Sequence, residues 1–459
     1  MTAPTTPMPI RRHRSTRPLA IVAATAVILG GSYVLAALRP VTPTPARSTP
    51  PVAAAAPAAP TTIDAGAAAS GSLRQIDHSI EAWSKNLAVN PRDYLSATTL
   101  AVLYQGRGRL SYDLADHERA LTAARTALGI EPTHAPARAI EAAILLTLHD
   151  FAGAFAAADA LVRDDPSQLG ALATRFDAEL ELGRITDARS DLERLAGTGG
   201  PAFLVRQARL ASVTGDAAGA LASAQRAVSA AADDEAGDLG FYAYAVGEYA
   251  RLAGDAQVAR LAYRQALDAR NGDLGALIGL ARIDAFEGND VAAMAGLTRA
   301  IEIAPQPEAL ALLGDLQAAA EDRQATTSFD TVRFIERLGD IQSTTFDRQL
   351  LRFELDHSGA SEAMLGRARA SMEARPDWTG HDTLAWALYR LGRLDEAADE
   401  IAAARALGAD DARLRFHDGA IATARGDRAA GAALLRSALD LGPALDPVER
   451  AEATALFGS

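Results

Sequence analysis

The sequence predicts an all-α protein built as a solenoid of repeated helical hairpins, and three observations lead to this prediction. A small-residue position recurs about every 34 residues between Ala120 and Gly431. A glycine often stands five residues earlier, where a tight turn would join two helices. The chain is 49% hydrophobic but only 5% aromatic, so we expect a core of Ala and Leu, which suits close helix packing.

The clearest unit spans residues 384–407. Its first half is an apolar segment with helical spacing that ends at Gly392, where the missing Cβ allows a tight turn. In its second half, Ala397, Ile401 and Ala404 recur at i, i+4 and i+7, which places them on one face of a helix. Such a hairpin cannot bury its apolar face alone, so it predicts neighbours of the same kind.

The unit recurs along most of the chain. The positions equivalent to Ala397 are Ala120, Ala154, Ala188, Ala220, Ala259, Ala293, Ala325, Ala363, Ala397 and Gly431, with steps of 34, 34, 32, 39, 34, 32, 38, 34 and 34 residues. The prolines that close second helices, 12 residues later, are Pro132, Pro166, Pro305 and Pro443. Around Ala325 the alignment is ambiguous by one residue.

This period, with its small residues and closing prolines, resembles the tetratricopeptide repeat (TPR) family in a membrane-anchored, bacterial-type form. The resemblance covers roughly residues 76–456 and implies a right-handed α-solenoid of about ten repeats. Its motif residues are packing residues, so it indicates a fold far more strongly than a function.

The chain begins with segments of a different character. Residues 1–17 form a basic tail, and residues 18–38 form an uncharged apolar run that would be about 31 Å long as a helix, enough to span a bilayer. Residues 39–72 form a linker rich in Pro and Ala. Residues 73–459 are then the solenoid, opening with an unpaired helix that carries the apolar stripe from Ile76 to Leu87 and caps the stack.

We predict that residues 18–38 form a transmembrane signal anchor. The arginines before the run predict a cytoplasmic N-terminus and repeats outside the membrane. The alternative is a signal peptide cleaved near residues 34–36, which would release a secreted protein.

Three stretches depart from the regular repeat. Residues 106–112, which begin Gly-Arg-Gly, are expected to form a loop insertion between the helices of the first hairpin. His149 takes a turn position that glycine fills in other repeats. The end of the chain, from Asp446 and Pro447 to Leu456, predicts a single helix that closes the array, because it starts with an N-cap residue and a proline at the first helical position.

Charge and composition exclude several classes of function. The net charge is −13 while residues 1–60 contribute +6, so the rest carries −19 and repels nucleic acid. The chain has no cysteine, which removes thiolate chemistry and cysteine metal sites. No HExxH, GxSxG or Walker A motif occurs, and the repeats occupy nearly all the folded length. We therefore expect no enzyme activity, no cofactor and no metal site.

Binding is the remaining class of function. In the TPR family the first helices line a concave groove that takes peptides or partner segments. Aromatic residues and arginines are the usual anchors of interfaces. Placed on that pattern, the residues expected to face the groove are Phe241, Tyr244, Glu248, Arg251, Arg282, Arg348, Arg352, Trp386 and Tyr389. The alternative for each is that it fills the contact between neighbouring repeats.

The resemblance and this residue set predict an extracytoplasmic, membrane-tethered scaffold or adaptor that binds protein or peptide partners in its groove. The alternative is a carrier or sensor that holds a small molecule or glycan there, which predicts a closed, deep pocket near residues 241–249. The lysine-rich groove of TPRs that clamp two carboxylates is missing here, because Lys85 is the single lysine of the chain.

Overall fold

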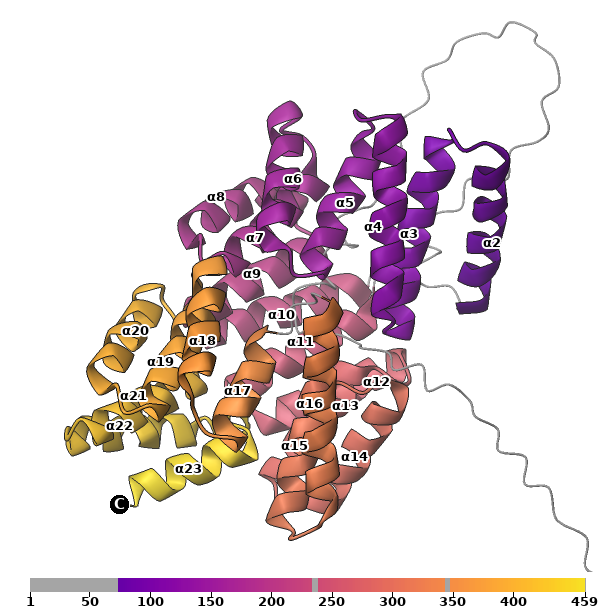
Figure 1. Ribbon diagram of the computed structural model, residues 1–459. Helices are drawn as coiled ribbons and strands as arrows, with labels where there is room; N and C mark the ends of the chain where they lie inside the picture. The colour runs from indigo at the N-terminus through magenta and orange to yellow at the C-terminus, as the bar shows by residue number, and fades with distance from the viewer. Residues whose placement is uncertain (1–72, 233–237, 343–346, 459) are drawn as a thin grey trace, which may run out of the picture.

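The computed structural model describes residues 73–232, 238–342 and 347–458, with backbone alone for 338–342 and 347. This part of the chain holds 22 α-helices in succession (Figure 1). The predicted basic tail, transmembrane segment and linker, residues 1–72, lie outside it. Within the described part, no helix is both long enough and apolar enough to cross a membrane.

Ten helical hairpins make up the body of the molecule. Their first helices are α3 (Tyr94–Ser111), α5 (Ala135–Thr147), α7 (Leu169–Glu181), α9 (Pro201–Val213), α11 (Leu239–Leu252), α13 (Leu274–Phe286), α15 (Pro307–Ala319), α17 (Asp347–His357), α19 (Trp378–Arg390) and α21 (Ala412–Ala424). Their second helices are α4 (Leu114–Ile130), α6 (Phe151–Asp164), α8 (Ile185–Leu195), α10 (Ala217–Ala232), α12 (Ala256–Ala269), α14 (Asp290–Ile303), α16 (Gln324–Gln342), α18 (Glu362–Ala374), α20 (Leu394–Ala406) and α22 (Arg428–Asp440). Helix α2 (Leu73–Val89) precedes them, α23 (Pro447–Phe457) follows them, and η3 (Ala196–Thr198) and η4 (Gly442–Ala444) are short 3₁₀ turns.

Each small-residue position lies in a second helix, as the period predicts. Most are fully buried: Ala154, for example, is 0% exposed, and so is Ala397. The equivalence proposed for Ala363 is wrong, because this residue is exposed. Leu365 takes its place at 0% exposed, three residues into α18, and Ala397 likewise lies three residues into α20. Helices α16 and α17, which precede α18, differ in length from the corresponding helices of other repeats. The equivalent position in α18 therefore comes two residues later than the period predicts.

The first hairpin corrects a second expectation. Residues 106–111 continue α3 as helix instead of forming a loop insertion, and Tyr112 then makes the turn with φ of 58°. Gly108 allows α4 to pack closely on this extension of α3, since a Cβ there would lie 2.9 Å from the ring of His117 on α4. His149 does occupy its turn with a positive φ of 63°, the conformation that glycine adopts in other repeats.

The hydrophobic core is a series of clusters between neighbouring helices. One cluster around Trp386 and Leu384 joins helices from α17 to α23, and another around Tyr242 joins α9 to α12. Adjacent helices thus bury each other's apolar faces, as expected for a solenoid in which each repeat contacts its neighbours.

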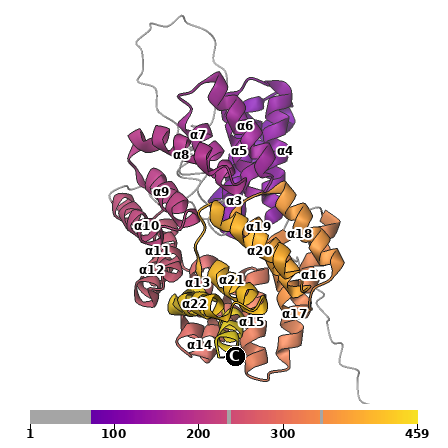
Figure 2. The same ribbon diagram turned by 90° about the vertical axis from the view of Figure 1, so that its left-hand side faces the viewer.

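The hairpins wind into a superhelix that returns upon itself. In Figure 2, α3–α8 lie at the top, α9–α12 on the left, α13 and α14 at the bottom and α15–α17 on the right, while α19–α22 lie in front. Contacts confirm the return: Arg375 binds Glu181 across 194 residues of sequence, and Arg251 binds the Pro443 carbonyl across 192. At 34 residues a repeat, one superhelical turn takes between five and six repeats.

The two superhelical turns meet at three successive hairpin turns, a contact that we call the inter-turn seam. It pairs Gly183 with Pro376, Gly215 with Gly408, and Gly254 with Leu441. A Cβ added to Gly183 would overlap the Pro376 carbonyl oxygen. Added Cβ atoms would lie 2.8 Å from the Gly408 oxygen and 3.2 Å from the Leu441 oxygen at the other two glycines. The seam glycines therefore serve close approach of backbones as well as a positive φ.

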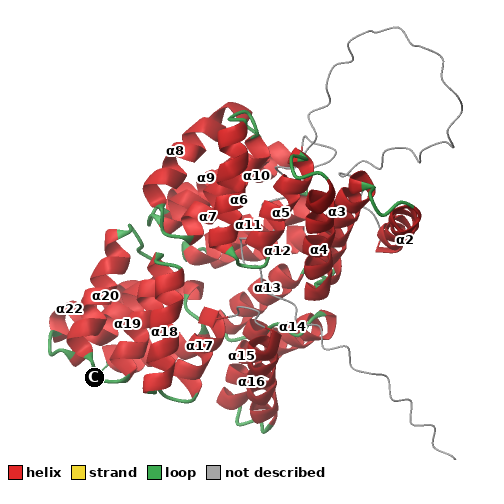
Figure 3. Ribbon diagram, turned by 45° about the horizontal axis from the view of Figure 1, so that its top comes forward, coloured by secondary structure: helices red, strands yellow, loops and turns green. Residues whose placement is uncertain are grey.

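Helix α23 closes the array as predicted, with Asp446 and Glu449 forming a capping box and Pro447 at the first turn. It packs on α21 and α22 and also reaches α15 in the earlier superhelical turn. The whole described part consists of helices and the loops that join them, without a strand (Figure 3). The start of this helix thus contributes to the inner surface of the superhelix, and the helix bridges its two turns.

Candidate binding cavity

A cavity of about 790 Å³ lies inside the superhelix. First helices from α7 to α21 form most of its wall, together with the first turn of α23. Ten carboxylates and seven arginines line it, so the wall is highly charged. The first helices thus supply the inner surface, which is where the TPR resemblance places a binding groove.

Five of the nine residues predicted to face the groove line this cavity. They are the charged members of the set: Glu248, Arg251, Arg282, Arg348 and Arg352.

In the described part of the chain, the four predicted aromatic residues lie outside the cavity wall. Phe241 is 6% exposed between α9 and α12, and Tyr244 packs on Tyr263 with ring centres 6.2 Å apart. Trp386 is 1% exposed and stacks on Tyr389 at 4.9 Å. These positions fit the alternative interpretation, that they fill contacts between helices, because buried aromatic pairs contribute packing energy there. A direct role for them in binding stays a prediction.

Arg251 joins the two superhelical turns at one end of the cavity. Its guanidinium donates to the carbonyl oxygens of Pro443 and Ala444 at 3.2 and 3.4 Å, and to Glu248 at 3.1 Å. The hydroxyl of Tyr263 also donates to Glu248. This arginine therefore has internal partners for both terminal nitrogens and acts mainly as a clasp.

Arg282 makes a second clasp, between α13 and the start of α23. It donates to Asp446 at 2.9 Å and to Glu308 at 3.3 Å. Burial opposes ionisation of Asp446, but Arg282, Arg251 and Arg413 outweigh it and lower the pKa of this carboxyl well below its usual range. Asp446 is thus held as a carboxylate that ties the C-terminal helix to an earlier repeat.

Arg348 organises the junction of α18 and α19. It donates to Ser371 at 3.0 Å, to Thr379 at 2.7 Å and to the backbone oxygen of Arg375, and it pairs with Asp377. Every nitrogen of this guanidinium is satisfied within the protein. The geometry makes it a structural residue of the cavity wall.

Sequence reasoning missed several residues that shape the cavity. Arg375 binds Glu181 on α7 and lies 4.5 Å over the ring of Phe151 on α6. Arg413 of α21 pairs with Glu449 of α23. The contacts of Arg375 join units far apart along the chain, so the 34-residue period holds no signal for them.

The described residues hold no group of three or more His, Asp or Glu side chains that could bind a metal ion. On the cavity wall, His357 and Asp315 form a histidine–carboxylate pair 2.7 Å apart. Burial opposes protonation of this histidine, but the hydrogen bond and charge of Asp315 outweigh it and raise its pKa. The pair links α17 to α15.

No model of a known protein family matches the chain, and no curated protein matches it. Among solved structures, it is similar to a tetratricopeptide repeat protein from Parabacteroides merdae, at 17% identity over 56% of this chain and 98% of that one, with a TM-score of 0.32. The human IFIT1 dimer with PPP-AAAA matches at 14% identity over 68% of this chain and 72% of that one, with a TM-score of 0.45. Yeast Tom70 matches at 12% identity over 78% and 95%, with a TM-score of 0.32.

The chain's own helices and contacts define its fold. Ten consecutive hairpins with a period near 34 residues, small buried residues in the second helices and glycine turns make it an α-solenoid of TPR type. In this solenoid the second superhelical turn returns onto the first, and both turns contribute to the wall of a charged cavity.

Proposed function

We propose that the protein is an adaptor that binds a segment of a partner protein inside its central cavity. The observation that supports this most directly is the cavity wall, where first helices from both superhelical turns present charged side chains to one shared cavity. Charged groups held by a rigid scaffold give orientation and specificity to a bound chain. A flat or convex surface would contact a segment from one side only.

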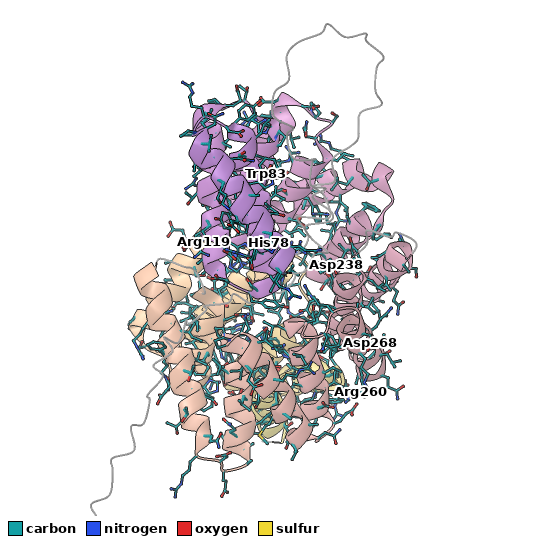
Figure 4. The ribbon with its side chains drawn as sticks, turned by 90° about the vertical axis from the view of Figure 1, so that its right-hand side faces the viewer. His78, Trp83, Arg119, Asp238, Arg260 and Asp268 are labelled. Atoms are coloured by element: carbon teal, nitrogen blue, oxygen red, sulfur yellow. The ribbon has the colours of Figure 1, made fainter. Side chains whose placement is uncertain are left out.

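Site-specific photo-crosslinking tests this proposal. A photoreactive amino acid at Ser212 would face the cavity, whereas one at Arg264 would lie on the exposed outer side of α12, whose neighbouring residues Arg260 and Asp268 are labelled in Figure 4. We expect a defined protein adduct from Ser212 and none from Arg264. Equal adducts at both positions, or none at Ser212, would contradict binding inside the cavity.

A second candidate function is a carrier or sensor of a small molecule. The cavity volume of about 790 Å³ favours it, since small-ligand pockets commonly measure about 300–1,000 Å³. Native mass spectrometry of the purified protein separates the two functions: a small co-purifying mass supports the carrier, and a peptide or protein adduct supports the adaptor.

We further propose that residues 18–38 anchor the protein in a membrane with the solenoid on the extracytoplasmic side. The proposal rests on the uncharged run, the arginines that precede it and the linker of residues 39–72. Protease that reaches the outer face of the membrane should digest the solenoid while the cytoplasm stays intact. Protease that cannot reach that face should leave the solenoid undigested. A mature protein that starts after residue 36 and is recovered without membranes would support the secreted alternative.

A further inference from the structure

Arg352 differs from the other arginines of the cavity wall. Six of the seven have a hydrogen bond or ion pair with another residue. Arg352 has neither within the described residues, although it lies on the wall near the middle of α17. Its side chain is therefore a charged donor on the cavity wall that no described protein group engages.

The nearest carboxylates are engaged elsewhere. Glu449 binds Arg413, and Asp382 binds His417 at 2.7 Å. Asp356, one helical turn from Arg352, accepts a hydrogen bond of 2.8 Å from the indole of Trp386. The protein thus supplies no counter-charge in contact with the guanidinium.

A partly buried cation without a partner is unfavourable, and the pKa of Arg352 reflects this. Burial and, next, the repulsion of Arg413 lower it to about 10, so the residue is still charged at neutral pH. An anion that entered the cavity would relieve this cost.

Gln349 adds a second donor on the same face. It lies three residues before Arg352, which places both side chains on one side of α17, and both line the cavity. Within the described residues its amide has no hydrogen bond. A guanidinium beside an amide presents several N–H groups to one planar acceptor.

We propose that Arg352, assisted by Gln349, binds a carboxylate of the segment that enters the cavity. This inference rests on the proposed adaptor function. A carboxylate matches the planar fork of a guanidinium and carries one charge. The ten carboxylates of the wall outnumber its seven arginines and disfavour ligands with several negative charges, such as phosphate clusters.

The carboxylate has two sources, an acidic side chain or the C-terminus of the partner. The probe is a library of synthetic decapeptides, prepared with a free C-terminus and with a C-terminal amide, and offered to the full-length protein in detergent. Peptides that bind are resynthesised with each Asp and Glu replaced by Asn and Gln. Loss on amidation identifies the C-terminus, and loss on side-chain replacement identifies an acidic residue.

Three variants complete the test. Arg352→Gln should weaken binding of the selected peptides about tenfold or more, as expected when a hydrogen-bonded charge pair is lost. Arg352→Lys should retain part of the affinity, since it keeps the charge without the planar fork. Arg264→Gln, which removes an exposed arginine from α12, should bind like the wild type.

Binding that is unchanged in Arg352→Gln would overturn the inference while leaving the adaptor function in place. If no peptide binds the wild type, both the adaptor function and this inference are overturned. Because Arg352 has no internal partner to lose, the unliganded Arg352→Gln variant should melt at or above the wild-type temperature. A clear drop in that temperature would show an internal role and would also count against the inference.

Discussion

The inter-turn seam makes a graded prediction for glycine substitutions. Gly183, Gly215 and Gly254 have positive φ and meet the second superhelical turn, whereas Gly392 has the same backbone conformation, with φ of 76°, and open space around it. Changing each to alanine separates the cost of conformation from the cost of contact. The strain of a left-handed backbone, about 1–2 kcal/mol, applies to all four.

The additional loss of stability from steric overlap applies only at the seam. It should increase as the distance between the added Cβ and the opposite backbone oxygen decreases. An alanine Cβ would overlap the Pro376 oxygen at position 183, lie 2.8 Å from the Gly408 oxygen at 215 and 3.2 Å from the Leu441 oxygen at 254. These are backbone atoms, so a rotamer change cannot relieve the overlap. Overpacking of this kind costs about 1–3 kcal/mol. We therefore expect Gly183→Ala to lose about 2–5 kcal/mol and the control Gly392→Ala only about 1–2 kcal/mol.

The assay is urea unfolding of the full-length protein followed by circular dichroism, combined with hydrogen exchange. Because long repeat arrays need not unfold in one step, hydrogen exchange is needed to locate the loss. In Gly183→Ala, faster exchange should appear at residues 180–185 and 374–379 together. Equal losses for Gly183→Ala and Gly392→Ala, without exchange at the opposite turn, would refute the seam.

Three further predictions concern buried ionisable groups. Burial, with a smaller contribution from Arg109, lowers the pKa of His117 to about 4. The unfolded chain therefore takes up a proton at higher pH than the folded protein, and the free energy of unfolding should fall by up to about 3 kcal/mol between pH 6.5 and 4. Urea midpoints at both pH values should show a smaller fall in His117→Gln than in the wild type. Burial, followed by the charge of Asp191, raises the pKa of Glu179 to about 8, so the free energy of unfolding should fall as pH rises from 4.5 to 8. Glu179→Gln should be more stable than the wild type at pH 8, on the order of 1 kcal/mol. An unchanged or lower urea midpoint of the variant would contradict this. Asp446→Ala leaves Arg282 without its closest partner and should lower the free energy of unfolding by about 2–4 kcal/mol, with faster hydrogen exchange in α23. A double-mutant cycle with Arg282→Ala should show coupling between the two residues, and additive losses of stability would contradict the clasp.

The sequence predicted the repeat unit because that unit is encoded locally. Ala397, Gly392 and the residues between them determine one hairpin through spacing within a single 34-residue window, and ten such hairpins are present. The failures arose where helix lengths departed from the period, as before Ala363, or where a glycine within a helix resembled a turn. Gly108 suggested a loop, but the ring of His117 fills the space that its missing Cβ leaves, and α3 continues as helix.

The cavity was predictable only in part, for a related reason. First-helix positions gave Glu248, Arg251 and Arg282 as inward-facing residues, because helical periodicity assigns a face. The same periodicity cannot tell a residue in the cavity from one in the contact with the next repeat, so it also selected the buried Trp386.

The pitch of a superhelix is the sum of small rotations between repeats, and no single window of sequence reports that sum. Here the accumulated rotation brings hairpin turns of the first superhelical turn against segments that follow second helices about 192 residues later, so Arg251 becomes a clasp across the seam as well as part of the wall. Arg375 likewise lines the cavity and joins the two superhelical turns through its contact with Glu181. The contacts that hold the two superhelical turns together are therefore also the contacts that determine the width of the cavity. Arg352 stands apart from them, because its charge lines the same space without being used to close it.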